Sequence, residues 1–395
     1  MMPPFRNRRL PLAWLNLTHD PGRLLTSLSG IVFSVILMFM EYGFWNALMD
    51  STAEPIRKLD ADDNDLIMIS ASKHTLAAKA WFSLRRLYEA RQFAAVEAAY
   101  PIYIEARASI WRNPASGRAR KIRVLAFDPD QPVFRTDVVS RASAEALKRP
   151  DTALMDVLSK PVYGRHEMGV EAVLSRRPIR IVGTFRLGTD FVTDGNLIMS
   201  DQNYLRYVPD RRLDPPDLRD VDLGLLKVAP GADLQALVAA LRRALPGDVA
   251  FATRDELIDK EQRFWMSHTP VGTIFGFGMA MGFVVGAVIC YQVLSSDIRA
   301  QLPEYATLKA MGYGDHYFTT VVLHEALILA LLGFVPGLLA SLLLDAGLVW
   351  GTGLLMVVTP GRAGLVLALT VGMCTLSGCV AIRKLLSADP VELFK

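Results

Sequence analysis

The chain has 395 residues, of which 51% are hydrophobic and 21% are charged, and its mean hydropathy is +0.26. This average is too apolar for an ordinary soluble protein and too charged for a chain buried wholly in lipid, so it indicates two unlike parts. The formal net charge of +3 is nearly neutral for this length and gives no support to a nucleic-acid partner.

Four apolar stretches reach the roughly 20 residues that a helix needs to cross about 30 Å of hydrocarbon. We expect transmembrane helices at residues 24–45, 271–294, 318–344 and 363–382. The first stretch is too long for the apolar part of a cleaved signal peptide, and no small-residue cleavage pattern follows it. The chain is therefore predicted to be a multi-pass membrane protein in contact with membrane lipids.

Basic residues indicate the orientation of these helices. They precede the first span and follow the last one: Arg6, Arg8, Arg9, Arg23, Arg383 and Lys384. Because short cytoplasmic flanks carry the excess of arginine and lysine, both termini are expected in the cytoplasm. Segments 1–23, 295–317 and 383–395 are then cytoplasmic, and 345–362 is a short external loop.

The polar segment 46–270 lies between the first two spans and is expected on the periplasmic side. Short strand-like runs recur in it at 66–70, 120–127, 180–185, 196–199 and 222–228. Residues 232–244 carry leucine and valine at helical spacing, and a polar helix at 254–264 leads toward the second span. The predicted fold class is an α-helical membrane protein with four transmembrane helices plus a large α+β periplasmic domain inserted between helices 1 and 2.

The cytoplasmic segment 295–317 contains a short predicted helix. It begins near Pro303, since proline is favoured in a first helical turn, and ends at Gly312 and Gly314. A small exposed helix with apolar residues is typical of a docking element, but the same pattern fits a plain connector. The residues alone leave both interpretations open.

Motifs for nucleotide or metal chemistry are absent from the sequence. No G-x-x-x-x-G-K-[ST] loop occurs, so ATP hydrolysis is not expected in this chain. His324 and Glu325 begin an H-E-x-x-H pattern, but Ile328 stands where the second histidine belongs. Cys290, Cys374 and Cys379 lie in apolar stretches and are expected to be packing residues. We therefore predict no enzyme activity, catalytic residue, metal or cofactor.

Two carboxylates occur within the predicted spans. Glu41 lies near the outer end of the first span and Glu325 near the cytoplasmic end of the third. Such groups usually face a bundle interior or a cavity, so they are candidates for a gating or ion-coupling site. We favour the alternative that they are structural, with a helix–helix hydrogen bond or a carboxylate that reaches the interface. Their opposite depths argue against a shared proton pathway.

Glycines recur in the predicted second and third spans. The second carries G-x-x-x-G spacings at 272/276, 278/282 and 282/286, which allow close helix packing within the chain or across a dimer. In the third, Gly333, Pro336 and Gly337 permit a kink.

Several segments resemble the DevC family of ABC exporter permeases, within the FtsX/MacB-like class. They are PLAWLNLTHDPGRLLTSLSGIVFSVILMFMEYGF (11–44), LDADDNDLIMIS (59–70), VLAFDPDQPVF (124–134), LPEYATLKAMGY (302–313) and ADPVELFK (388–395). The second segment departs from the family's shorter L-x-A-D-L pattern. The matches are spread over essentially the whole chain, and 302–313 is the most distinctive.

The resemblance implies a permease that works as a homodimer with a separate ABC ATPase subunit, which binds the ATP. It also implies a periplasmic membrane-fusion adaptor and a TolC-like outer-membrane channel. ATPase-coupling residues would be Pro303, Glu304, Tyr305, Leu308, Lys309, Met311 and Gly312. A second ATPase contact would involve Asp389, Pro390 and Glu392.

These features predict a permease that transmits ATP-driven motion to its periplasmic domain and drives export of a lipid, glycolipid or other amphiphile. Two related functions remain open at this stage. One is an FtsX-like regulatory transducer of a cell-wall hydrolase, and the other is a lipoprotein-releasing permease.

Overall fold

The computed structural model describes Trp14 and residues 21–190, 192–208, 218–268, 270–300, 307, 311–312, 314–352 and 358–386. These residues divide into two compact units. The first, the helical unit, contains the described residues of 1–46, 272–347 and 356–395. The second, the outer domain, contains those of 47–271 and 348–355.

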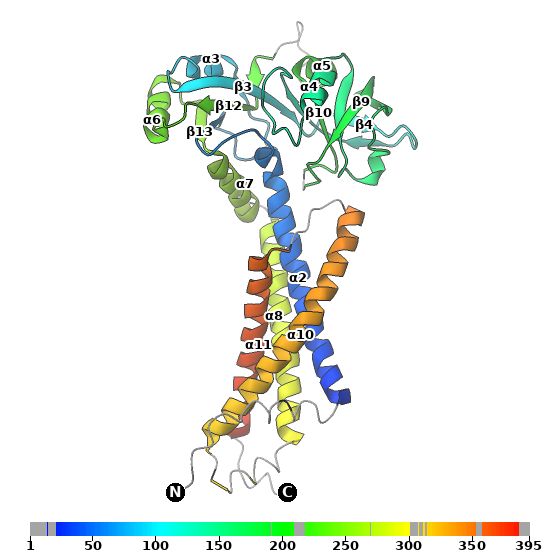
Figure 1. The fold of residues 1–395 in the computed structure, drawn as a ribbon, viewed down its shortest axis with the longest axis vertical. Helices are drawn as coiled ribbons and strands as arrows, with labels where there is room; N and C mark the ends of the chain where they lie inside the picture. The colour runs from blue at the N-terminus through cyan, green and yellow to red at the C-terminus, as the bar shows by residue number, and fades with distance from the viewer. Residues whose placement is uncertain are drawn as a thin grey trace. The chain divides into compact units, whose positions relative to one another are not determined.

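Four long apolar helices account for the helical unit. They are α2 (Pro21–Arg57), α8 (Pro270–Ala300), α10 (Asp315–Thr352) and α11 (Pro360–Leu386), and α2 continues into the outer domain (Figure 1). Each is long and apolar enough to cross a membrane, with mean hydropathy between 1.9 and 2.6 in its best stretch. The prediction of four such helices is confirmed, whereas the points at which they enter and leave the bilayer remain predictions.

Small residues let these helices approach one another closely. A Cβ on Gly286 of α8 would lie 2.9 Å from the Cβ of Ser34 on α2, and one on Gly337 of α10 would lie 2.6 Å from Val35 Cγ1. On α11, the Ser377 hydroxyl donates to the carbonyl of Ala287 on α8 over 2.7 Å. Since lipid provides no hydrophobic driving force between helices, such close contact is a main source of their association. The glycine spacings at 278/282 and 282/286 therefore allow α8 to pack against α2 within the chain, whereas a Cβ added to Gly276 would meet no atom within 4 Å.

The outer domain is built on one mixed sheet of eleven strands. Their order across the sheet is β13-β1-β12-β3-β6-β10-β7-β9-β8-β4-β5. Their bounds are β1 Leu66–Ser70, β3 Val96–Glu105, β4 Ile110–Arg112, β5 Ala119–Lys121, β6 Arg123–Phe127, β7 Thr152–Asp156, β8 Glu171–Leu174, β9 Arg177–Phe185, β10 Asn196–Ser200, β12 Leu223–Val228 and β13 Val249–Ala252. The short β2 (Phe82–Ser83) and β11 (Asp220–Val221) form a separate pair. Strands β6 and β10 pair in parallel, as do β7 and β9.

The central strands are buried on both faces, which explains why they read as continuous apolar runs. In β1, Leu66 and Met68 face one core while Ile67 and Ile69 face the other. The first core is covered by α3 (Arg85–Ala90), α5 (Asp201–Tyr207) and α6 (Leu234–Ala244). The second is covered by the end of α2, by α4 (Arg141–Leu147) and by α7 (Arg254–His268). A three-layer α/β arrangement results.

The local predictions for this domain agree with the structure. The strand predicted at 66–70 is β1, and the helix predicted at 232–244 is α6, which is capped by Asp233 accepting from the backbone N–H groups of Gln235 and Ala236. The polar helix predicted at 254–264 is α7, which extends to His268. The run at 120–127 is divided between β5 and β6, because the chain passes from one edge of the sheet to its centre at Ile122.

Candidate functional site

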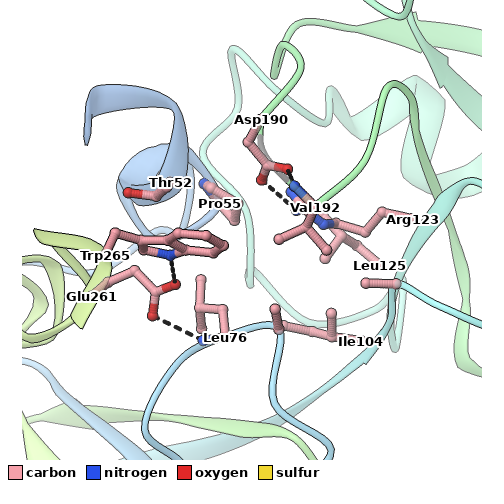
Figure 2. Close-up of a pocket in the computed structure, with 12 residues that line it drawn as sticks. Thr52, Pro55, Leu76, Ile104, Arg123, Leu125, Asp190, Val192, Glu261 and Trp265 are labelled. Carbon is pink, nitrogen blue, oxygen red and sulfur yellow. Dashed lines mark hydrogen bonds and ion pairs between the residues drawn. The ribbon is translucent and has the colours of Figure 1, made fainter. Parts of the chain in front are cut away.

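The strongest polar cluster of the outer domain ties α7 to the loop that follows β1. Glu261 on α7 accepts a hydrogen bond of 2.6 Å from the Thr75 hydroxyl and one of 2.8 Å from the backbone N–H of Leu76. One turn later, the indole N–H of Trp265 donates to the same carboxylate over 3.0 Å (Figure 2). We call these four residues the α7 clamp. They fix the last helix before the second apolar helix to the body of the outer domain.

Burial governs the electrostatics of the clamp. Only 4% of Glu261 is exposed, and this desolvation raises the pKa of its carboxyl above the usual value of 4.5. The hydrogen bonds from Thr75, Trp265 and Leu76 act in the opposite direction because they stabilise the charged form. A carboxylate that accepts three donors is satisfied inside the protein, whereas its removal would leave those donors unpaired.

Lysine side chains stiffen the loop that the clamp holds. Lys73 is 2% exposed, and its ammonium donates to the carbonyls of Ala78 and Ala80 over 3.0 Å each. The same ammonium lies 3.6 Å from the Asp222 carboxylate. From α7, Lys260 donates to the carbonyl of Lys73 over 2.9 Å. Lys73 thus joins the two ends of the loop between β1 and β2. Two successive residues of α7, Lys260 and Glu261, bind this loop.

A small cavity separates the clamp from a buried ion pair. It is lined by both Glu261 and Trp265 and has room for about one water molecule (Figure 2). On its far side, Arg123 pairs with Asp190, and their side chains are 7% and 4% exposed. Asp190 also accepts from the backbone N–H groups of Val192 and Thr193. This arrangement joins the start of β6 to the segment that follows β9.

Metal binding has no support at this site. Among the residues that the structure describes, no group of three or more histidine, cysteine, aspartate or glutamate side chains is arranged to hold a metal ion. The hydrogen bonds to Glu261 fix α7 against the loop that follows β1, and α8 begins two residues after α7 ends.

The two predicted intramembrane carboxylates occupy different environments. Glu41 is half-buried on α2 and lies over Gly278 of α8, where an added Cβ would come within 2.5 Å of its Oε2. Glu325 on α10 is 1% exposed. No hydrogen bond or ion pair joins the two within the described part of the chain. Whether either one gates or couples transport remains a prediction.

The predicted coupling helix falls mostly outside the described residues. Pro303, Glu304, Tyr305, Leu308 and Lys309 lie outside them, as do the tail residues Asp389, Pro390 and Glu392. Met311 is 64% exposed, and Gly312 has a φ of +96°, the left-handed conformation in which glycine ends helices. Whether Met311 and Gly312 contact an ATPase remains a prediction.

Sequence reasoning did not identify the α7 clamp or the Arg123–Asp190 pair. A partial signal existed for the clamp, because Glu261 and Trp265 stand four residues apart on a polar helix. Nothing in the sequence marks Thr75 as their partner, since it lies 186 residues before Glu261. The ion pair joins residues 67 apart and has no local signature.

Within the described residues, the chain combines four helices that are long and apolar enough to cross a membrane with one large α/β domain. Residues 276–390 match the family model of the FtsX-like permease C-terminal domain, a range that includes most of α8, all of α10 and α11. This part of the chain is therefore similar to the FtsX-like permease C-terminal domain, in agreement with the predicted resemblance to FtsX-like permeases. The finer assignment to the DevC family remains a prediction.

The chain also has distant similarity to solved structures. The periplasmic region of MacB from Actinobacillus actinomycetemcomitans has 10% identity and a TM-score of 0.34, over 51% of this chain and 92% of that one. The extracellular domain of the noncanonic ABC-type transporter YknZ from Gram-positive bacteria has 8% identity and a TM-score of 0.32, over 48% and 100%. A comparison with curated proteins found no match.

Proposed function

We propose that this chain is the membrane subunit of an ABC-type exporter and works with a separate ATPase. The observation that carries the proposal is the FtsX-like permease domain at 276–390, which follows a large outer domain in the chain. The ATPase would dock on the cytoplasmic segment around Met311 and Gly312 and on the C-terminal tail. We place the chain in a bacterial inner membrane with both termini in the cytoplasm.

In this mechanism the chain transmits motion and performs no bond chemistry. Closure of the ATPase on ATP would move the helices, and that movement would reach the outer domain along α2 and along α7. The α7 clamp supports this role because it binds α7 to the sheet through two hydrogen bonds from the loop after β1. Close to the clamp, Gln262 of α7 donates to the carbonyl of Met49 on α2 over 3.3 Å. The two helices that enter the outer domain are thus tied to each other inside it.

The proposed cargo is a lipid, glycolipid or other amphiphile, exported by a homodimer through a membrane-fusion adaptor and an outer-membrane channel. The test is affinity purification of the tagged full chain in mild detergent, followed by mass spectrometry. Recovery of an ABC ATPase with an adaptor supports export. Recovery of the ATPase with a cell-wall hydrolase would instead support an FtsX-like transducer, and with a lipoprotein carrier a lipoprotein-releasing permease. Absence of any ATPase would overturn the proposal.

A second experiment tests the coupling segment. Replacement of Glu304 by alanine together with Leu308→Asp should lower ATPase activity of the purified complex while the chain still inserts into the membrane. The physical reason is that a charged group replaces an apolar contact and an ion-pairing group is removed. Unchanged activity in this double variant would disprove the coupling assignment and leave membrane insertion unaffected.

A further inference from the structure

One end of the outer sheet is unusually basic. Residues 106–123 and 164–186, which include the strands β4, β5, β8 and β9, contain eleven arginines and lysines and two glutamates. The whole chain, by contrast, has a net charge of only +3. These four strands are neighbours in the order β9-β8-β4-β5, so the charges gather on one lobe of the domain (Figure 1). We call this region the basic lobe.

Most cations of the basic lobe are exposed, and they far outnumber its two glutamates, Glu167 and Glu171. Ten of the eleven are exposed, and the exception is the buried Arg123, which pairs with Asp190. Within the described part of the chain, none of these ten forms an ion pair with another residue. Elsewhere in the domain, exposed basic side chains such as Arg85 and Lys148 do form ion pairs. Uncompensated like charges on one lobe repel one another, and this repulsion is relieved when an anionic partner binds.

Strand register places several of these cations on one surface. Lys121 of β5 is opposite Ile110 of β4, and Arg112 of β4 is opposite Val173 of β8. On the next strand, Arg180 of β9 is opposite Glu171. Because cross-strand partners and residues two apart share a face, these side chains form one surface that crosses four strands.

The turn between β8 and β9 adds to this surface at a cost in backbone energy. Ser175 and Arg176 have φ values of +47° and +71°, the conformation of a two-residue hairpin turn that favours asparagine and glycine. An arginine held in this conformation is strained, and such strain is found more often where a side chain has a function. Arg176 lies in this turn, whereas Arg177 is opposite Leu174 and belongs to the other face of the strand from Arg180.

Apolar groups among the cations distinguish this surface from a simple solvated face. Ile110 is 48% exposed between the charges, and Met168 is 71% exposed at the rim of an adjoining groove of about 820 Å³. Arg180 and Glu171 line the same groove. Arginine and methionine are enriched at protein interfaces. A groove can accept a protruding loop of a protein, whereas a flat layer of lipid headgroups has no such loop.

We propose that the basic lobe is a docking surface for a second protein with an acidic, partly apolar contact face. Charge complementarity steers such a partner to the lobe, while Ile110, Met168 and the groove supply the contacts that exclude water. This inference does not depend on the exporter function, because it rests on the charge and exposure of the lobe alone.

The test uses the full chain in nanodiscs of phosphatidylcholine and a poly-L-glutamate peptide as the probe. One variant combines Arg112→Glu, Lys121→Glu and Arg180→Glu. The matched control changes the charge equally at exposed residues outside the lobe, with Arg91→Glu, Arg242→Glu and Arg243→Glu. Neither set contains an ion-paired side chain, so both variants should keep the thermal stability of the parent chain.

The lobe variant should bind the peptide about tenfold more weakly or worse, because electrostatic steering changes association rates by about 10 to 1,000-fold, and the control should bind nearly as the parent does. An equal loss in both variants would mean a general charge effect and would overturn the proposal, as would no loss in either. Vesicles of phosphatidylglycerol serve as competitor. If they bind the lobe while the peptide does not, the partner is a lipid surface and the protein proposal is wrong.

Discussion

Different interactions stabilise the interior of the helical unit and the interior of the outer domain, although both units belong to one chain. In the helical unit, glycines such as Gly286 and Gly337 let two helices pack so closely that an added Cβ would overlap the neighbouring helix. In the outer domain, apolar strands form two cores, and buried charges such as Lys73 and Asp222 are matched with partners. The difference follows from the solvent. Water drives apolar burial in the outer domain, whereas lipid leaves shape as the main determinant of helix packing.

The largest expected effect is on a buried charge of the outer domain. Asp190→Ala should destabilise that domain by about 3–5 kcal/mol, because Arg123 would remain buried without a partner. Thermal unfolding followed by tryptophan fluorescence measures the loss. The double variant Arg123→Met with Asp190→Leu is the control and should be much nearer to the parent, since it removes both charges. Equal destabilisation in the single and double variants would show that packing, and not charge, matters here.

The next largest effect is expected in the helical unit. Gly337→Leu places a side chain where even a Cβ would lie 2.6 Å from Val35, so it should cost about 1–3 kcal/mol or prevent assembly of the helices. Gly372→Leu on α11 is the matched control, because no atom lies within 4 Å of its added Cβ. Size-exclusion chromatography and thermal aggregation in detergent compare the two. If both variants behave alike, close helix approach at Gly337 is not required.

A smaller and more specific effect is expected at the α7 clamp. Glu261→Ala should destabilise the outer domain by about 1–3 kcal/mol, because three hydrogen-bond donors lose their acceptor. If the clamp transmits motion, this variant should also reduce transport per ATP hydrolysed, while the ATPase itself continues to turn over. Glu89→Ala removes a carboxylate of the same domain that pairs with exposed Arg85, and it should leave transport unchanged. Normal transport with Glu261→Ala would remove the clamp from the mechanism.

The smallest effect is a pH dependence that arises from the same carboxylate. Burial raises the pKa of Glu261 in the folded chain above 4.5, so the folded form takes up its proton at a higher pH than the unfolded form. The resulting stability is fully present below pH 4.5 and is lost as the pH rises through the raised pKa. Glu261→Gln should flatten this part of the pH profile of the melting temperature. An unchanged profile would show that other groups, such as His166, control it.

Some of the fold follows from local sequence because it depends on spacing alone. Four apolar stretches predict the four helices, since a minimum length of apolar residues is needed in lipid. Likewise the alternation of apolar runs and turns predicts β1, β10 and β12, and the helical spacing at Leu234–Leu241 predicts α6. Asp233 caps α6 in the structure and is a local signal for the start of this helix that the prediction at 232–244 did not use.

Tertiary structure alone decided the rest, because the contacts involved join residues far apart in the chain. The order of the eleven strands, with β13 beside β1 and β4 beside β8, depends on which apolar faces meet. The same is true of Glu261 with Thr75 and of Arg123 with Asp190, whose partners have no mark in sequence. The glycine spacings predicted close packing, but only the fold assigned Gly286 to Ser34 of α2. The local sequence determines which side chains each segment can bury, and the tertiary structure determines which other segments those side chains pack against.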